Sequence, residues 1–179
     1  MKRFLLSAFV LLGACASAPA SAPAGTASHP EEAAILAVVD AALLAAGNHD
    51  GAAAAKVFVA DGWMFLQRRT AAQEGAVSKR SVQSFLSPAV GADPFIERYW
   101  EPVVQVRGGI AQVWAPYELR DNGAAVHCGI DAFQLVKTDG AWKVASLMFT
   151  MEPDACGEIG LPEVSKMRPR DGWREAPLQ

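Results

Sequence analysis

The chain has 179 residues, of which 51% are hydrophobic and 20% are charged, so it has room for one globular domain with extensions rather than for two domains. Its 16 basic and 19 acidic residues give a formal net charge of -3, and after Lys2-Arg3 the adjacent basic residues are only the separate pairs Arg68-Arg69 and Lys79-Arg80. Because this pattern makes no basic face, we expect no nucleic-acid partner.

Residues 1–15 have the features of a bacterial signal peptide. Lys2-Arg3 is a charged start, and the apolar run from Phe4 to Leu12 is too short to span a bilayer. The next residues, Leu12-Gly13-Ala14-Cys15, resemble a lipobox, in which the cysteine is lipidated and becomes the mature N-terminus. We therefore predict a protein on the periplasmic side of the cell envelope, anchored in a membrane through Cys15. Cleavage near Cys15 without lipidation would instead leave a soluble periplasmic protein.

Two cysteines remain beyond Cys15. Cys128 and Cys156 form an even pair, and an exported protein resides in an oxidising compartment, where disulfides persist. The sequence does not show whether the two Cα atoms come close enough for a bridge. A disulfide and two free thiols therefore both stay open.

The chain divides into a tether, a domain and a tail. Residues 16–28 are almost only Ala, Ser, Pro and Gly, which predicts a flexible tether. Residues 29–152 form the predicted domain. Residues 153–179 mix Pro, Gly and charge without a period, which predicts an irregular C-terminal tail.

The first half of the domain is predicted to be mainly helical. Ile35, Val39 and Leu43 follow helical spacing and predict a first helix that ends at Gly47. Further along, we expect a short helix over residues 51–58, a strand over 63–67, a polar stretch over 68–77 and a third helix that begins at residue 78 and stops before Pro88.

Two turn signals organise the second half of the domain. The dipeptides Asn122-Gly123 and Asp139-Gly140 suit two-residue hairpin turns, which need positive φ. The runs 110–119, 125–136 and 142–151 around them are rich in β-branched and aromatic residues. The sequence therefore predicts an α+β fold, with a curved antiparallel sheet wrapped around three N-terminal helices.

Three parts of the chain resemble the nuclear transport factor 2-like superfamily, which includes SnoaL-like, lumazine-binding-like and ketosteroid-isomerase-like proteins. They are residues 50–65, the stretch Arg98-Tyr99-Trp100-Glu101-Pro102, and the strand sequences 113–118, 127–131 and 142–146. The resemblance implies a cone-shaped domain with a pocket between the concave sheet and the helices, often dimeric through the sheet. The superfamily contains isomerases, dehydratases, hydrolases and binders without activity, so the resemblance predicts a fold rather than a reaction.

The two turns also predict which side chains face the pocket. If they set the register, Glu118 lies opposite His127 and Asp131 lies opposite Met148. The face with large aromatic and polar groups is then the pocket, with the predicted ligand-binding residues Trp63, Gln112, Trp114, Glu118, Phe133, Ser146 and Met148. The mostly aliphatic face, which includes Val113, Tyr117 and Leu147, is expected to be convex and to form a homodimer interface.

Asp131 and His127 are the catalytic candidates. Burial would raise the pKa of Asp131, which could then act as a general base with His127 assisting. The structural alternatives are a satisfied hydrogen-bond acceptor at Asp131 and an exposed ion pair between His127 and Glu118. The chain has no metal-ligand spacing, phosphate loop or dinucleotide motif, so we expect no metal and no cofactor.

These observations favour an exported protein that binds a small apolar or aromatic molecule in a pocket on the concave sheet face. The first alternative is a cofactor-independent isomerase or dehydratase that uses Asp131 and His127. The second is a non-catalytic accessory protein of the envelope, which engages another protein through its convex face or its tail.

Overall fold

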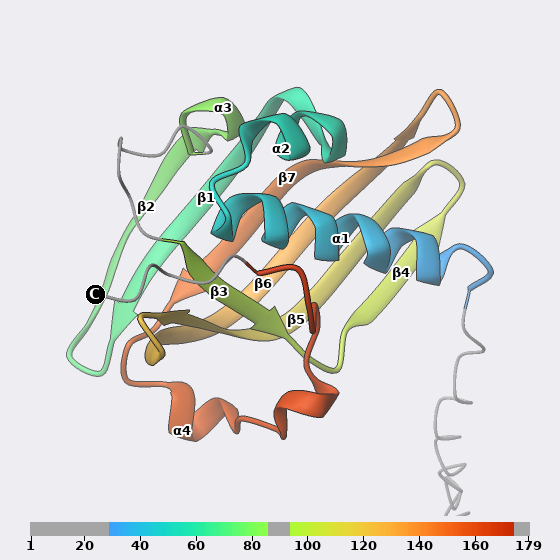
Figure 1. The fold of residues 1–179 in the computed structure, drawn as a ribbon. Helices are drawn as coiled ribbons and strands as arrows, with labels where there is room; N and C mark the ends of the chain where they lie inside the picture. Colours follow the sequence, from blue (N-terminus) through green and yellow to red (C-terminus); the bar gives the residue numbers. More distant parts are fainter. Residues whose placement is uncertain (1–28, 86–93, 174–179) are drawn as a thin grey trace, which may run out of the picture.

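The computed structural model describes residues 29–85 and 94–173 (Figure 1). Cys15, the predicted signal peptide and the tether lie outside these residues, so lipidation at Cys15 stays a prediction. Within the two described ranges, no helix is both long and apolar enough to cross a membrane.

Helices come first and most of the strands follow, as an α+β fold requires. The helices of the domain are α1 (Glu32–Gly47), α2 (Gly51–Val57) and α3 (Val82–Phe85). The strands are β1 (Phe58–Thr70), β2 (Gln73–Ser81), β3 (Phe95–Tyr99), β4 (Val103–Arg107), β5 (Ile110–Asp121), β6 (Ala124–Thr138) and β7 (Ala141–Met151). The predicted helix, helix, strand, helix and meander order is thereby confirmed, with β2 added before α3 and with β3 and β4 added before the meander.

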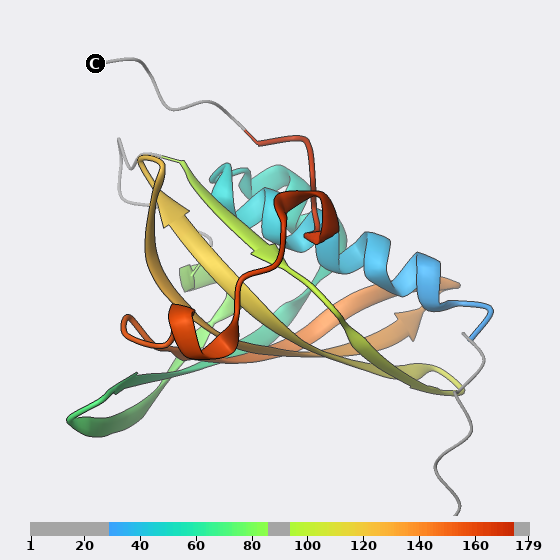
Figure 2. The same ribbon diagram turned by 90° about the horizontal axis from the view of Figure 1, so that it is seen from below.

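The strands form one curved sheet in the order β2-β1-β7-β6-β5-β3, and β4 pairs with the other half of β5. All neighbours are antiparallel except β1 and β7, which run parallel, so the expectation of a purely antiparallel sheet is wrong for this pair. The sheet curves around α1, which lies along its concave face (Figures 1 and 2).

The first added strand, β2, occupies the polar stretch and the start of the third helix expected from the sequence. It is an edge strand that pairs with β1 from Thr70 opposite Gln73 to Trp63 opposite Ser81. Charged and polar residues protect an edge strand from pairing with other chains, and the same residues conceal it from a search for apolar alternation.

Both predicted hairpin turns are confirmed. Asn122 and Gly123 have φ values of 47° and 77°, and Asp139 and Gly140 have φ values of 52° and 79°. The pairing next to each turn is also as expected: Asp121 lies opposite Ala124 and Thr138 opposite Ala141.

Beyond the turns, two β-bulges shift the register by one residue. Val126 is an extra residue of β6, because Arg120 pairs with Ala125 while Leu119 already pairs with His127. Ala145 is likewise an extra residue of β7, between the pairs Leu135–Val144 and Gln134–Ser146. A shift of one residue turns every later side chain to the other face, so the bulges reverse much of the predicted face assignment.

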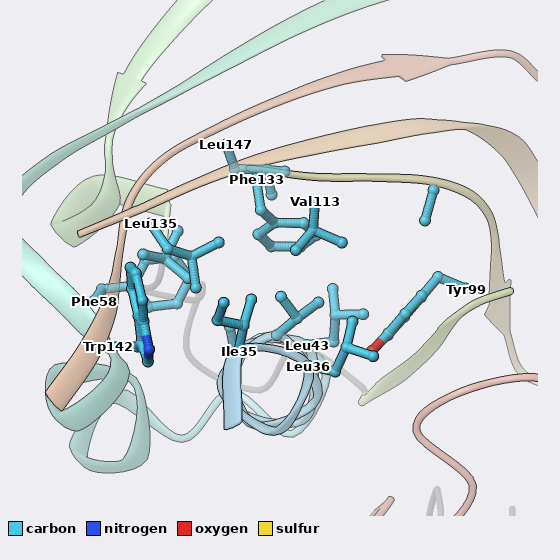
Figure 3. Packing of buried hydrophobic residues seen from close by; sticks show 14 of the residues in the cluster. Ile35, Leu36, Leu43, Phe58, Tyr99, Val113, Phe133, Leu135, Trp142 and Leu147 are labelled. Atoms are coloured by element: carbon cyan, nitrogen blue, oxygen red, sulfur yellow. The ribbon is translucent and has the colours of Figure 1, made fainter. Parts of the chain in front are cut away.

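The core lies between α1 and the concave face of the sheet (Figure 3). Ile35, Val39 and Leu43 of α1 are buried against the sheet, which contributes Val113 and Phe133. Burying each such side chain contributes about 1.5–3 kcal/mol. Helix α1 is apolar on most of its surface, and its larger side chains lie on the side that packs against the sheet.

The residues after β7 pack against the domain. They form α4 (Cys156–Ile159) and a 3₁₀ helix, η1 (Val164–Lys166), and Cys156 is joined to Cys128 by a disulfide with Cα atoms 5.1 Å apart. The segment then passes around the β3 edge toward α1 (Figures 1 and 2).

Arg168 fastens this segment to both β3 and α1. Its backbone exchanges two hydrogen bonds of 2.7 Å with Tyr99, and its guanidinium lies 2.6 Å from Asp40 Oδ2. The Tyr99 hydroxyl donates to Asp40 Oδ1 at 2.8 Å. The C-terminal segment therefore covers the exposed edge of β3, and it holds β3 against α1.

Candidate functional site

A cavity of about 270 Å³ lies between α1 and the concave face. Most of its wall is apolar, with side chains such as Leu43, Phe95, Phe133, Leu147 and Phe149 from four different elements. The polar side chains that line it are Arg80, Glu97 and His127. A cavity of this kind can enclose an apolar molecule and fix its orientation by a few polar contacts.

His127 is held by a chain of hydrogen bonds. Its Nδ1 lies 3.1 Å from the Tyr117 hydroxyl oxygen, and that hydroxyl donates its proton to the Thr150 carbonyl oxygen at 2.7 Å. The Tyr117 oxygen must therefore accept a hydrogen bond from Nδ1–H. Nε2 of the neutral ring is then left as an acceptor, on a side chain that lines the cavity.

The surroundings keep both rings of this chain neutral. Burial, together with the charge of Arg68, lowers the pKa of His127 to about 4. Burial also raises the pKa of Tyr117 above its ordinary value. Gly129, opposite Tyr117 in the register, makes room for the ring, because a Cβ there would lie 2.8 Å from a Tyr117 ring carbon.

Glu97 of β3 and Asp131 of β6 form a carboxyl pair across the concave face. Asp131 is completely buried, and neither of its carboxyl oxygens has a hydrogen-bond partner among the described residues. Burial, and then the neighbouring Glu97, raise the pKa of Asp131 well above its ordinary value. Burial raises the pKa of Glu97 to about 7, although Asp131 acts in the opposite direction.

One proton shared by the pair accounts for these features. Two carboxylates in contact cannot both be ionised at low cost, so the more buried group keeps its proton. Asp131 then keeps the proton, and Glu97 is the member of the pair that lines the cavity. The site thus holds a carboxyl group with a pKa of about 7, Glu97, and an uncharged imidazole, His127.

Solved structures of other proteins have a fold similar to that of this chain. A nuclear transport factor 2-like protein with a cystatin-like fold from Novosphingobium aromaticivorans is 12% identical, with a TM-score of 0.51 over 71% of this chain and 85% of its own. A protein with a cystatin-like fold from Nostoc punctiforme is 10% identical, with a TM-score of 0.54 over 71% of this chain and 95% of its own. The chain has the nuclear transport factor 2-like fold.

Another solved structure, a proposed aromatic ring hydroxylase from Novosphingobium aromaticivorans, is 19% identical, with a TM-score of 0.55 over 69% of this chain and 92% of its own. No protein-family model matches the sequence, and no curated protein matches it significantly. At these identities the likeness establishes the nuclear transport factor 2-like fold alone, which confirms the cone-shaped α+β prediction.

Within this nuclear transport factor 2-like fold, two of the predicted site residues line the cavity. His127 and Phe133 do so directly, while Asp131 lies buried behind Glu97. The expected pairing of His127 with Glu118 is wrong, because Leu119 pairs with His127 after the bulge at Val126.

The remaining predicted site residues do not line the cavity. Five of them, Trp63, Gln112, Trp114, Ser146 and Met148, are on the outer face of the sheet. Trp114 and Met148 are 49% and 46% exposed there. Glu118 is buried on the same side of the sheet, 3.3 Å from the Arg120 guanidinium. For the residues of β5 and β7, the physical reason is again the one-residue shift at each bulge, which the turn sequences do not reveal.

The prediction that the aliphatic face is convex is also wrong for several of its residues. Val113 and Tyr117 of β5 and Leu147 of β7 are buried on the concave side instead. On the outer face, Trp114, Met148 and Val77 border a shallow apolar groove of about 260 Å³. In the described residues no group of three or more His, Cys, Asp or Glu side chains could hold a metal ion.

Sequence reasoning overlooked Glu97 and Tyr117. Phe95, Glu97 and Tyr99 alternate along β3, so the inward position of Glu97 could have been found from this short strand. Tyr117 could not have been placed without the bulge at Val126.

Proposed function

We propose that the protein binds a small, mostly apolar molecule in the cavity under α1. The observation that supports this is an apolar cavity that is lined by a fixed imidazole acceptor, His127, and by the carboxyl group of Glu97. Its volume of about 270 Å³ is just below the range of about 300–1,000 Å³ found for ligand pockets. The ligand is therefore small, and it carries at least one polar group that meets His127 or Glu97.

Filling the cavity tests this proposal. Ala46 lines the cavity from α1, so Ala46→Phe would put a benzyl group into the space of the ligand. We expect ligand binding to weaken by about tenfold or more, which corresponds to about 1.4 kcal/mol or more. Ala37→Phe, on the exposed side of the same helix, is the matched control and should bind normally.

Native mass spectrometry of the wild-type chain and of both variants, purified from the natural host, would identify a retained molecule and measure its loss. A molecule retained equally by the wild type and by Ala46→Phe would contradict the proposal, because it would lie outside the cavity.

Acid–base catalysis is the second candidate function, as in a cofactor-independent isomerase or dehydratase. It is favoured by one observation: Glu97 lines the cavity with a pKa of about 7, beside an uncharged His127. A general base works best with a pKa near the working pH. Glu97 then takes the role first expected of Asp131, and Asp131 orients it and tunes its proton affinity.

If the protein is such an enzyme, Glu97→Gln should lower kcat for a ketone or alcohol that binds in the cavity by roughly 100- to 10,000-fold. Binding of that substrate should change far less. Glu158→Gln, an exposed position of α4, is the matched control. Unchanged turnover in the Glu97→Gln variant would exclude catalysis by this carboxyl group and leave the binding proposal intact.

Export, anchoring through Cys15 and dimerisation complete the proposal. The Cys128–Cys156 disulfide supports an oxidising compartment, and the exposed Trp114 and Met148 support an interface on the outer face. Mass spectrometry should detect a lipid-modified Cys15 at the mature N-terminus, and unmodified Cys15 would contradict the anchor. Sedimentation as a monomer at micromolar concentration would contradict the dimer.

A further inference from the structure

One arginine side chain lines the cavity, and a second contacts one of the lining residues. Arg80 of β2 lines it, opposite Met64 of β1 in the register. Arg68 lies on the same face of β1 as Met64 and Leu66, and its Nη1 is 3.3 Å from Sδ of Met151, which also lines the cavity. Arg80 therefore brings a guanidinium to the cavity wall, and Arg68 lies next to a residue of that wall, on the strand that pairs with β2.

Among the residues that the structure describes, no carboxylate neutralises these two cations. Neither guanidinium forms an ion pair with a carboxylate among the described residues, whereas the adjacent Arg69 contacts both Glu74 and Glu152. Both side chains remain exposed at the rim. The cavity therefore has a positively charged rim that the fold leaves available for a ligand.

The carboxyl pair lies on the opposite wall. Glu97 belongs to β3, at one edge of the sheet, while Arg80 belongs to β2, at the other edge. Apolar side chains of β6 and β7, including Phe133 and Phe149, lie between the two walls. A ligand that spans the cavity thus meets cations at one end, an apolar middle, and acceptors at the other end.

We propose that the natural ligand is a small organic acid whose apolar body fills the cavity and whose carboxylate is bound by Arg80 and Arg68. A guanidinium binds a carboxylate through two parallel hydrogen bonds, which are stronger than neutral ones and fix orientation. The interaction gains further strength beside an apolar wall, where water is partly excluded. This proposal rests on ligand binding in the cavity and adds the chemical class of the ligand.

Matched probes of equal chain length test the charge requirement. Octanoate and 1-octanol differ in the polar end alone, so binding of each to the full chain can be compared by calorimetry or by thermal shift. We expect octanoate to bind more tightly than 1-octanol. Arg80→Gln should weaken octanoate binding by about tenfold, which is about 1.4 kcal/mol, and should change 1-octanol binding far less.

Lys79→Gln is the control for charge. Lys79 is the neighbour of Arg80 on β2, but its Nζ lies 3.6 Å from the centre of the Trp63 ring on the outer face. This variant loses the same charge from the same strand, on the other side of the sheet, and should bind both probes like the wild type. Equal loss of octanoate binding in the two variants would overturn the proposal, because it would reduce the effect to net charge.

The other outcomes separate this proposal from the function on which it rests. If 1-octanol binds as tightly as octanoate and Arg80→Gln does not distinguish them, the organic-acid proposal fails while binding in the cavity stands. If octanoate binding persists in Ala46→Phe, the ligand lies elsewhere and the organic-acid proposal also fails. If neither probe binds, both proposals fail. Tight octanoate binding that both Ala46→Phe and Arg80→Gln abolish supports both.

Discussion

Replacing Cys128 and Cys156 with alanine should lower the free energy of unfolding by roughly 3–4 kcal/mol. The disulfide closes a loop across a sequence separation of 28, and a crosslink of that span removes much of the conformational freedom of the unfolded chain. In the folded state the same disulfide joins α4 to β6. It lies next to the backbone β-bridge between Cys128 and Glu152. Urea unfolding of the wild type and of the double variant measures the difference.

Chemical reduction supplies the control for this first prediction. Dithiothreitol should destabilise the wild type by a similar amount and should leave the double variant unchanged, because the variant has no disulfide left to reduce. Equal urea midpoints for the oxidised wild type and the double variant would show that the crosslink does not stabilise this fold.

A second large effect is expected from Asp131→Asn, and its size should depend on pH. The folded pKa of Asp131 is raised, so between its unfolded value near 3.8 and its folded value the native state binds more protons than the unfolded state. The free energy of unfolding of the wild type therefore falls as pH rises through this window, by up to about 1.4 kcal/mol for each pH unit. Asparagine has no carboxyl proton to lose, so the variant escapes the part of this loss that Asp131 causes.

Compared with the wild type, Asp131→Asn should gain stability progressively as the pH rises above the ordinary value of about 3.8 for this carboxyl group. Urea unfolding at several pH values measures this difference, and the titration of His127 cancels because both proteins contain it. Asp121→Asn, at the exposed end of β5, makes the same substitution where the carboxylate keeps its hydration on folding. Parallel pH profiles for the wild type and Asp131→Asn would refute the shared proton.

The C-terminal segment stabilises the position of β3, the strand that carries Glu97. Its bridge to Tyr99 and its ion pair with Asp40 hold β3 against α1, and β3 carries Glu97 into the cavity. Gly47 lets the segment approach α1 closely, because a Cβ there would lie 2.6 Å from a ring carbon of Trp173. The residues expected to form a tail therefore help to position the carboxyl pair.

Some features follow from the sequence because they depend on local interactions alone. The turns at Asn122-Gly123 and Asp139-Gly140 were predictable, since few residues adopt positive φ at low cost. The apolar spacing in α1 likewise predicted both the helix and its buried face. Edge strand β2 was missed because an exposed strand needs no apolar alternation.

The placement of site residues depended on contacts that no local pattern records. The extra residues Val126 and Ala145 look like ordinary strand residues, yet each reverses the faces of the strand pairing beyond it. For this reason Trp114 and Met148 face outward, although Asp131 and His127 face inward as expected.

The sequence by itself determined the fold class, the order of its main elements and the hairpin turns, because propensity and periodicity act over a few residues. Only the tertiary structure decided which side chains share the cavity. The pairing of Glu97 with Asp131 joins two strands separated by β5, and it exists only after the sheet has curved. Register and curvature are set by packing across the whole core, so chemistry that depends on them cannot be read from neighbours in the chain.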